Sequence, residues 1–161
     1  GTLTGGVALA FNEVLTELPF LVIFVALLIG TGGNAGSQTV ATIIRAITLG
    51  EVRMSNLFIT WRREIAVGFL LGIAMGTVGF GFALVSTPGD WDTAVRMAAV
   101  IALSLPTIVM WSTTIATIVP TVADHFDIDP TMISGPMIST IVDATGLAIY
   151  YALAGFIFGI Y

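Results

Sequence analysis

The hydrophobic pattern of this chain consists of four long apolar stretches joined by short polar connections. The stretches cover residues 18–49, 64–86, 93–122 and 133–161. An α-helix rises about 1.5 Å per residue, so roughly 20 apolar residues cross the ~30 Å hydrocarbon core of a bilayer. Each stretch therefore predicts a membrane-spanning helix.

Residues 1–16 are also apolar, but this segment is short and rich in glycine. We interpret it as the outer end of a first span whose beginning is missing. The predicted fold is an all-α integral membrane protein, a five-helix transmembrane bundle with an incomplete first helix. The connections at residues 50–53, 87–90 and 124–130 contain the Gly, Pro and Asp typical of turns. They leave room for no soluble domain, so residues 1–161 are expected to form one transmembrane domain.

The composition is typical of a protein that lipid surrounds. Hydrophobic residues make up 57% of the chain, charged residues 9%, and the mean hydropathy is +1.03. The net charge of −5 and the lack of lysine exclude the basic surface that nucleic-acid binding requires. The lack of cysteine excludes disulfides and thiolate metal ligands. No His-Glu-x-x-His or Gly-x-Ser-x-Gly motif occurs, so we do not expect an enzyme.

The distribution of arginine predicts the orientation in the membrane. Four of the five arginines flank the connection at residues 50–53, namely Arg45, Arg53, Arg62 and Arg63. Because Lys and Arg are enriched in cytoplasmic loops, we expect this connection to be cytoplasmic. Alternation of the spans then places the C-terminus outside, in a chain inserted in the plasma (inner) membrane.

Two glycine patterns lie within the apolar stretches. Gly68, Gly72 and Gly76 recur every four residues, with Gly79 and Gly81 following, which predicts a smooth helix face for close helix packing.

The second pattern, at residues 30–38, interrupts the 18–49 stretch and predicts weak helix continuity there. Irregular backbone in a membrane is tolerated only where protein buries it or water reaches it. Carbonyl groups and the amides of Asn34 and Gln38 would then face a permeation path. The alternative is close helix packing, with the amides as interhelical hydrogen-bonding groups.

Asp143 is the residue that the sequence singles out most clearly. It lies ten positions after Ile133, or about 15 Å along a helix, which is near mid-membrane. A carboxylate at this depth is costly and is a functional hypothesis by default. On a helix it shares a narrow face of small or polar residues with Gly135, Ser139 and Gly146. The alternative is a protonated Asp143 hydrogen-bonded to a neighbouring helix.

Acidic residues also lie at both predicted mouths of the bundle. Asp127 and Asp129 belong to the 124–130 connection, and Glu13 and Glu17 lie one helical turn apart near the N-terminus. We expect solvated polar segments there, or sites that concentrate divalent ions.

Two motifs resemble the MgtE family of magnesium channels and transporters. The run at residues 28–38, followed by residues 43–46, is similar to the glycine-rich second helix of that family. Asp129-Pro130, Gly135-Pro136 and residues 139–150 resemble its last helix, and the spacing between the motifs also fits. The resemblance covers essentially the whole chain.

This resemblance implies a transmembrane ion-conducting domain that works as a homodimer in the lipid bilayer. The pore would lie at the two-fold axis, between the second and fifth helices of both subunits. Asp143 matches the family's pore carboxylate, Ser139 a site that offers a backbone carbonyl, and Asn34 the asparagine of the glycine motif. Gly135 departs from the pattern, because some members have asparagine there.

The expected function is conduction of partly or fully hydrated Mg²⁺, with other divalent cations as further substrates. Magnesium holds its water tightly, so few protein ligands suffice. The alternative is a proton- or sodium-coupled secondary transporter in which Asp143 titrates and an interrupted helix binds the coupling ion.

Overall fold

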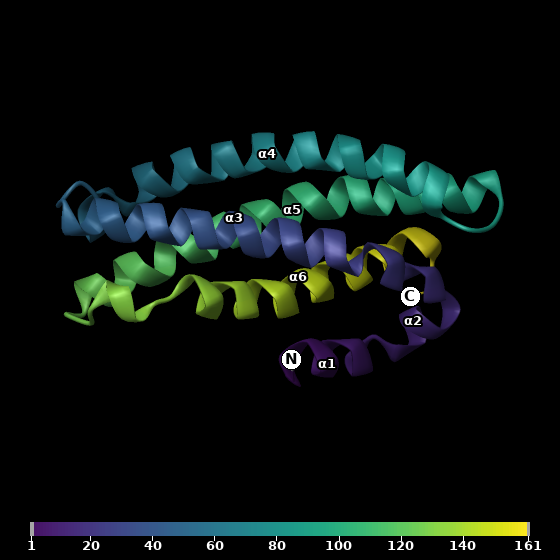
Figure 1. Ribbon diagram of the computed structural model, residues 1–161, viewed down its shortest axis with the longest axis horizontal. Coiled ribbons are helices and arrows are strands. Elements are labelled where there is room, and N and C mark those ends of the chain that lie inside the picture. Colours follow the sequence, from purple (N-terminus) through teal and green to yellow (C-terminus); the bar gives the residue numbers. More distant parts are fainter. Residues whose placement is uncertain (1, 161) are drawn as a thin grey trace.

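The computed structural model describes residues 2–160, and within this range every regular element is a helix (Figure 1). The elements in chain order are α1 (Thr2–Ala10), α2 (Asn12–Glu17), η1 (Pro19–Leu21), α3 (Val22–Thr48), η2 (Met54–Asn56), α4 (Leu57–Ser86), α5 (Trp91–His125), η3 (Pro130–Met132) and α6 (Gly135–Phe158). Gly1 and Tyr161, where two predicted stretches begin and end, lie outside the described residues.

Four of these helical segments are long and apolar enough to cross a membrane, which confirms the four complete spans predicted from the sequence. They run from Pro19 to Thr48, Met54 to Ser86, Trp91 to His125 and Gly135 to Phe158. Residues 2–17 form two short helices, α1 and α2, with a break at Phe11. The nine residues of α1 are too few to span a bilayer alone.

The four long helices lie side by side, and each runs in the opposite direction to the one before it in the chain (Figure 1). The α3–α4 and α5–α6 connections lie at one end of the bundle, and the α4–α5 connection and α2 lie at the other. The loops that the arginine pattern assigns to one side of the membrane therefore share one end of the molecule.

Polar capping residues mark where two of the long helices begin. The Asp90 carboxylate accepts a hydrogen bond from the Thr93 backbone N–H at 2.9 Å, and the Ser134 hydroxyl accepts one from Met137. These bonds satisfy donors that the first turn of a helix leaves free. Helix α6 ends at Gly159, whose φ of 72° is favourable for glycine.

Helix α4 begins at Leu57, seven residues before the predicted start at residue 64. The prediction treated this arginine-containing segment as a loop. The segment is helical and packs against α5, where the Trp61 indole N–H donates to the Thr114 hydroxyl at 3.1 Å.

The predicted glycine face of α4 is confirmed as a packing surface for α5. A Cβ on Gly72 would collide with the Pro106 Cα, and one on Gly68 would lie 2.8 Å from the Thr113 hydroxyl oxygen. Gly81, in contrast, faces open space. The two helices approach closely because this face has no side chains.

The predicted interruption of the 18–49 stretch is wrong, because α3 is continuous over 27 residues. Glycine weakens a helix in water, but in lipid the backbone has no other hydrogen-bonding partner. Helices α5 and α6 also pack directly on the glycines, since a Cβ at Gly32 would lie 2.6 Å from Ile108 Cγ2.

Candidate functional site

The glycine run of α3 lies directly against the Asp143 face of α6. A Cβ on Gly33 would be 3.0 Å from Asp143 Oδ1 and 3.5 Å from Ser139 Oγ. Gly36 is even closer to α5, where a Cβ would lie 2.5 Å from Ser112 Oγ. The two motifs singled out from the sequence thus form one site, at the crossing of α3 and α6.

Hydroxyl groups join the two helices around this crossing. Ser139 Oγ donates to the Gly33 carbonyl at 3.2 Å, and the Ser37 and Ser139 hydroxyl oxygens are 2.8 Å apart. Ser37 Oγ also donates to the Gly135 carbonyl at 3.4 Å. On the α5 side, Ser112 Oγ donates to the Gly32 carbonyl at 2.6 Å. The site is therefore a polar layer inside an apolar bundle.

Asp143 lines a hollow beside this polar layer. The hollow has a volume of about 210 Å³ and is lined by Thr2, Leu3 and Thr4 of α1 together with Thr140 and Asp143 of α6. Asp143 Oδ1 is buried and has no hydrogen-bond partner among the described residues. A buried acceptor without a donor is costly, so this carboxylate requires a proton, a cation or water.

The described residues supply no positive charge to Asp143. Their one ion pair joins Arg96 to Asp92 at 2.7 Å, at the beginning of α5. No group of three or more acidic or histidine side chains in residues 2–160 is arranged to hold a metal ion. Among residues 2–160, no cationic side chain is thus ion-paired with Asp143.

Asn34 and Gln38, predicted to line the pathway, lie on a neighbouring face of α3. Both are exposed, and they line a groove of about 410 Å³ with Leu71 and Met75 of α4. This groove is distinct from the Asp143 hollow within one chain. Two polar amides on the outside of a membrane-spanning helix need further polar partners.

The two predicted glycines of α6 differ in their surroundings. Gly135 is at the serine cluster, because a Cβ there would lie 3.4 Å from the Ser37 side chain. Gly146 is buried against α5, with Ile108 Cγ2 3.3 Å from a Cβ at that position. Gly146 therefore makes a helix–helix contact, and its role in a pathway stays a prediction.

The predicted mouth residues are all exposed. Asp129 accepts hydrogen bonds from the Thr131 hydroxyl at 2.7 Å and backbone N–H at 2.8 Å, and these bonds hold its pKa below the usual carboxyl range. Asp127 adopts a left-handed backbone conformation with φ of 56°. Glu13 and Glu17 lie on α2. A role for any of the four in attracting ions stays a prediction.

Gly33 and Ser37 belong to the site but were not predicted as site residues, because the sequence pattern marked only the whole run at residues 30–38. A signal was present, because Gly33 and Ser37 are four residues apart and hence on one face of a helix. The threonines of α1 gave no comparable signal, since their position depends on how residues 2–17 fold back on α6 (Figure 1).

Four helices long and apolar enough to cross a membrane, together with a buried carboxylate oxygen that has no described partner, indicate an integral membrane protein with an internal polar site. Comparison with known families gives the particular class. The profile of the MgtE family, described as divalent cation transporter, matches residues 25–153. The chain belongs to the MgtE family, which is a family of transporters and not of enzymes.

Individual relatives agree with this assignment. Over 154 residues the chain is 31% identical to the magnesium transporter MgtE of Thermus thermophilus. It is 27% identical to the proteins of the same name from Enterococcus faecalis and Bacillus subtilis. Each comparison covers 96% of this chain and 33% of the relative, so the chain spans about a third of the length of the curated relatives it matches.

Proposed function

We propose that this chain forms a transmembrane pathway for Mg²⁺, in which Asp143 binds the ion. The observation that carries the proposal is the buried, unpartnered Asp143 oxygen against the Gly33 backbone. A divalent cation would stabilise this carboxylate in a low-dielectric environment, where its attraction is stronger than in water. The relatives from Thermus thermophilus and Enterococcus faecalis are magnesium transporters, which supports magnesium as the ion.

The size of the hollow supports passage of a hydrated ion. The hollow beside Asp143, of about 210 Å³, has room for an ion together with several water molecules. Mg²⁺ retains its octahedral water shell more strongly than Ca²⁺ does. Hydroxyl and carbonyl groups around Ser139 would contact these waters, and a single carboxylate would supply the charge. Other divalent ions of similar hydrated size would also enter.

The pathway is proposed to lie at the two-fold axis of a homodimer. Asn34 and Gln38 are exposed on a membrane-spanning helix, where lipid cannot satisfy their hydrogen bonds. A second copy of α3 would supply amide partners, and the two copies of Asp143 would then create a −2 field along the same axis. Helices α3 and α6 of both subunits would line such a pore.

A proton- or sodium-coupled carrier is the competing mechanism. It was expected to use an interrupted helix for the coupling ion, and the continuity of α3 removes that feature. Measurement of proton movement during Mg²⁺ uptake distinguishes the two mechanisms. Flux that follows the membrane potential without proton exchange supports the channel, whereas obligatory proton exchange supports the carrier.

The test of the ion site is Mg²⁺ uptake by proteoliposomes that contain the purified protein, read with an enclosed Mg²⁺-sensitive dye. Asp143→Asn keeps the size of the side chain and removes its charge, so we expect uptake to fall to the level of empty vesicles. Asp92→Asn is the matched control, because it removes an equal charge from an exposed surface pair. Undiminished uptake by Asp143→Asn would refute the assignment.

A further inference from the structure

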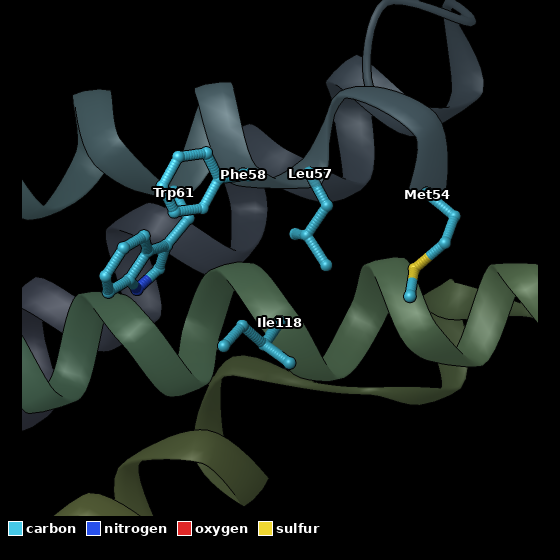
Figure 2. Close-up of a pocket in the computed structure, with 5 residues that line it drawn as sticks. All are labelled: Met54, Leu57, Phe58, Trp61 and Ile118. Carbon is cyan, nitrogen blue, oxygen red and sulfur yellow. The ribbon is translucent and has the colours of Figure 1, made fainter.

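An apolar groove opens between the first turns of α4 and the later part of α5. Figure 2 shows its five lining residues, with the Met54 and Leu57 side chains projecting from the α4 side toward α5 and Ile118 on α5. Phe58 and Trp61 complete the lining, and the volume is about 440 Å³. This volume falls within the range of roughly 300–1,000 Å³ that small-molecule sites occupy.

The groove presents no free hydrogen-bonding group to its occupant. The Trp61 indole N–H, the one polar group on its lining side chains, donates to Thr114 Oγ1 at 3.1 Å. The same bond fixes the indole ring against α5. The groove is therefore a preformed apolar slot that suits a hydrocarbon chain.

Two arginines lie beside this slot. The Arg62 guanidinium carbon is 5.9 Å from the centroid of the Phe58 ring, so the charge lies against a wall of the groove. Arg62 and Arg63 together line an adjoining hollow of about 300 Å³ with Ile59 and Ala66.

Neither arginine is ion-paired with a carboxylate among the described residues. Among residues 2–160 the one ion pair is that of Arg96 with Asp92, so Arg62 and Arg63 have no carboxylate partner. Glu64 follows them in sequence but is not ion-paired with either one. An anionic ligand at this position would meet two available guanidinium groups.

The depth of the groove in the membrane identifies the kind of anion. Helix α4 has 30 residues and is thus about 45 Å long, which exceeds the ~30 Å hydrocarbon core. Its first turns therefore reach the headgroup region, where aromatic and basic residues are enriched. Arg62 lies about 8 Å from the start of the helix, and the helix exceeds the hydrocarbon thickness by about 15 Å.

From these features we infer that the groove and the two arginines form a binding site for an anionic phospholipid. One acyl chain occupies the slot beside Trp61, and the headgroup phosphate accepts hydrogen bonds from Arg62 and Arg63. The predicted cytoplasmic orientation of this end places the site in the leaflet that carries anionic lipid. A zwitterionic lipid such as phosphatidylcholine fits the slot equally well, but its choline ammonium offsets the charge of its phosphate, so it gains less from the two arginines.

The test uses Trp61 as a local probe, because it lines the groove itself. The chain has three tryptophans, so the variant with Trp91→Phe and Trp111→Phe leaves Trp61 alone. This variant is reconstituted in phosphatidylcholine vesicles that contain brominated phosphatidylglycerol or brominated phosphatidylcholine, and quenching of Trp61 fluorescence is titrated. We expect a relative binding constant that favours phosphatidylglycerol about fivefold for each arginine.

Variants in the same background separate the charge from the slot. The double change Arg62→Gln and Arg63→Gln should make the two brominated lipids quench equally, and Arg96→Gln, which alters an arginine at the opposite end of the bundle, should preserve the preference. Circular dichroism and size-exclusion chromatography verify that each variant folds. Equal quenching by both lipids in the unaltered arginine background would overturn the inference, as would a preference that survives the double change. Either result leaves the proposed Mg²⁺ pathway unaffected, since that proposal rests on Asp143.

Discussion

The contact between Gly33 and Asp143 gives a prediction that the structure defines closely. In Gly33→Ala, the new methyl group would lie 3.0 Å from Asp143 Oδ1, whereas ordinary C···O contacts are about 3.3–3.6 Å. The carboxylate is the end of a flexible side chain, so it can retreat by a few tenths of an ångström and the helix can still form. We therefore expect a folded protein in which the ion site is displaced.

Gly30→Ala is the matched control, because within one chain a Cβ there has nothing within 4 Å, and Gly30 lines the Asn34 groove and not the Asp143 hollow. Both changes add one methyl group to the same helix, and both gain about 0.5–1 kcal/mol of helix propensity. Overpacking at a tight position costs about 1–3 kcal/mol, which only Gly33→Ala incurs. If about 1.4 kcal/mol of this cost appears as a less favourable free energy of Mg²⁺ binding, the dissociation constant for Mg²⁺ rises tenfold.

The assay for this pair is the Mg²⁺ concentration that gives half-maximal uptake in proteoliposomes, together with thermal unfolding of each variant. We expect the Mg²⁺ concentration for half-maximal uptake to rise roughly tenfold in Gly33→Ala and to stay unchanged in Gly30→Ala. Equal half-saturation in the two variants would show that the α3–α6 contact does not set the position of Asp143.

Two further predictions concern packing and a loop carboxylate. Gly72→Ala should lower the unfolding temperature relative to Gly81→Ala, because only the former meets the backbone of Pro106, at a cost of about 1–3 kcal/mol; equal temperatures would contradict the predicted close contact. Thr131→Val should raise the pKa of Asp129 toward its ordinary value, as measured by NMR titration, since it removes the hydroxyl bond that favours the charged form. The stabilisation from this bond is present above the ordinary carboxyl pKa of about 3.9 and is lost as pH falls through the lower native pKa. An unchanged Asp129 pKa in Thr131→Val would show that the hydroxyl bond does not cause the lowered pKa.

The membrane spans could be predicted from the sequence because lipid imposes a simple requirement on length and apolarity. The start of α4 could not, because the polar segment around Trp61 lacks the apolar signal of a span, and its contact with Thr114 of α5 is a tertiary feature. The continuity of α3 was missed for a similar reason. Its glycines weaken an isolated helix, but their contacts with α5 and α6 are tertiary features that propensity does not describe.

The candidate site was predictable in its parts more than in its arrangement. Depth in the membrane singled out Asp143, and composition singled out the glycine run. Their contact through Gly33 and Ser139 follows from how α3 and α6 rotate and cross, which spacing along one chain does not determine. The same reasoning grouped Asn34 with the Asp143 path, although within one chain Asn34 lines a separate groove.

The central claim is that a cation binds at Asp143. The most direct measurement is anomalous diffraction from crystals of the protein soaked in Mn²⁺, a divalent ion that gives an anomalous signal where Mg²⁺ does not. We predict an anomalous peak about 4 Å from the Asp143 carboxylate oxygens, the separation that one bridging water gives. The peak should be absent in Asp143→Asn crystals grown and soaked in the same way. No peak near Asp143, or a peak that persists after its charge is removed, would contradict the account.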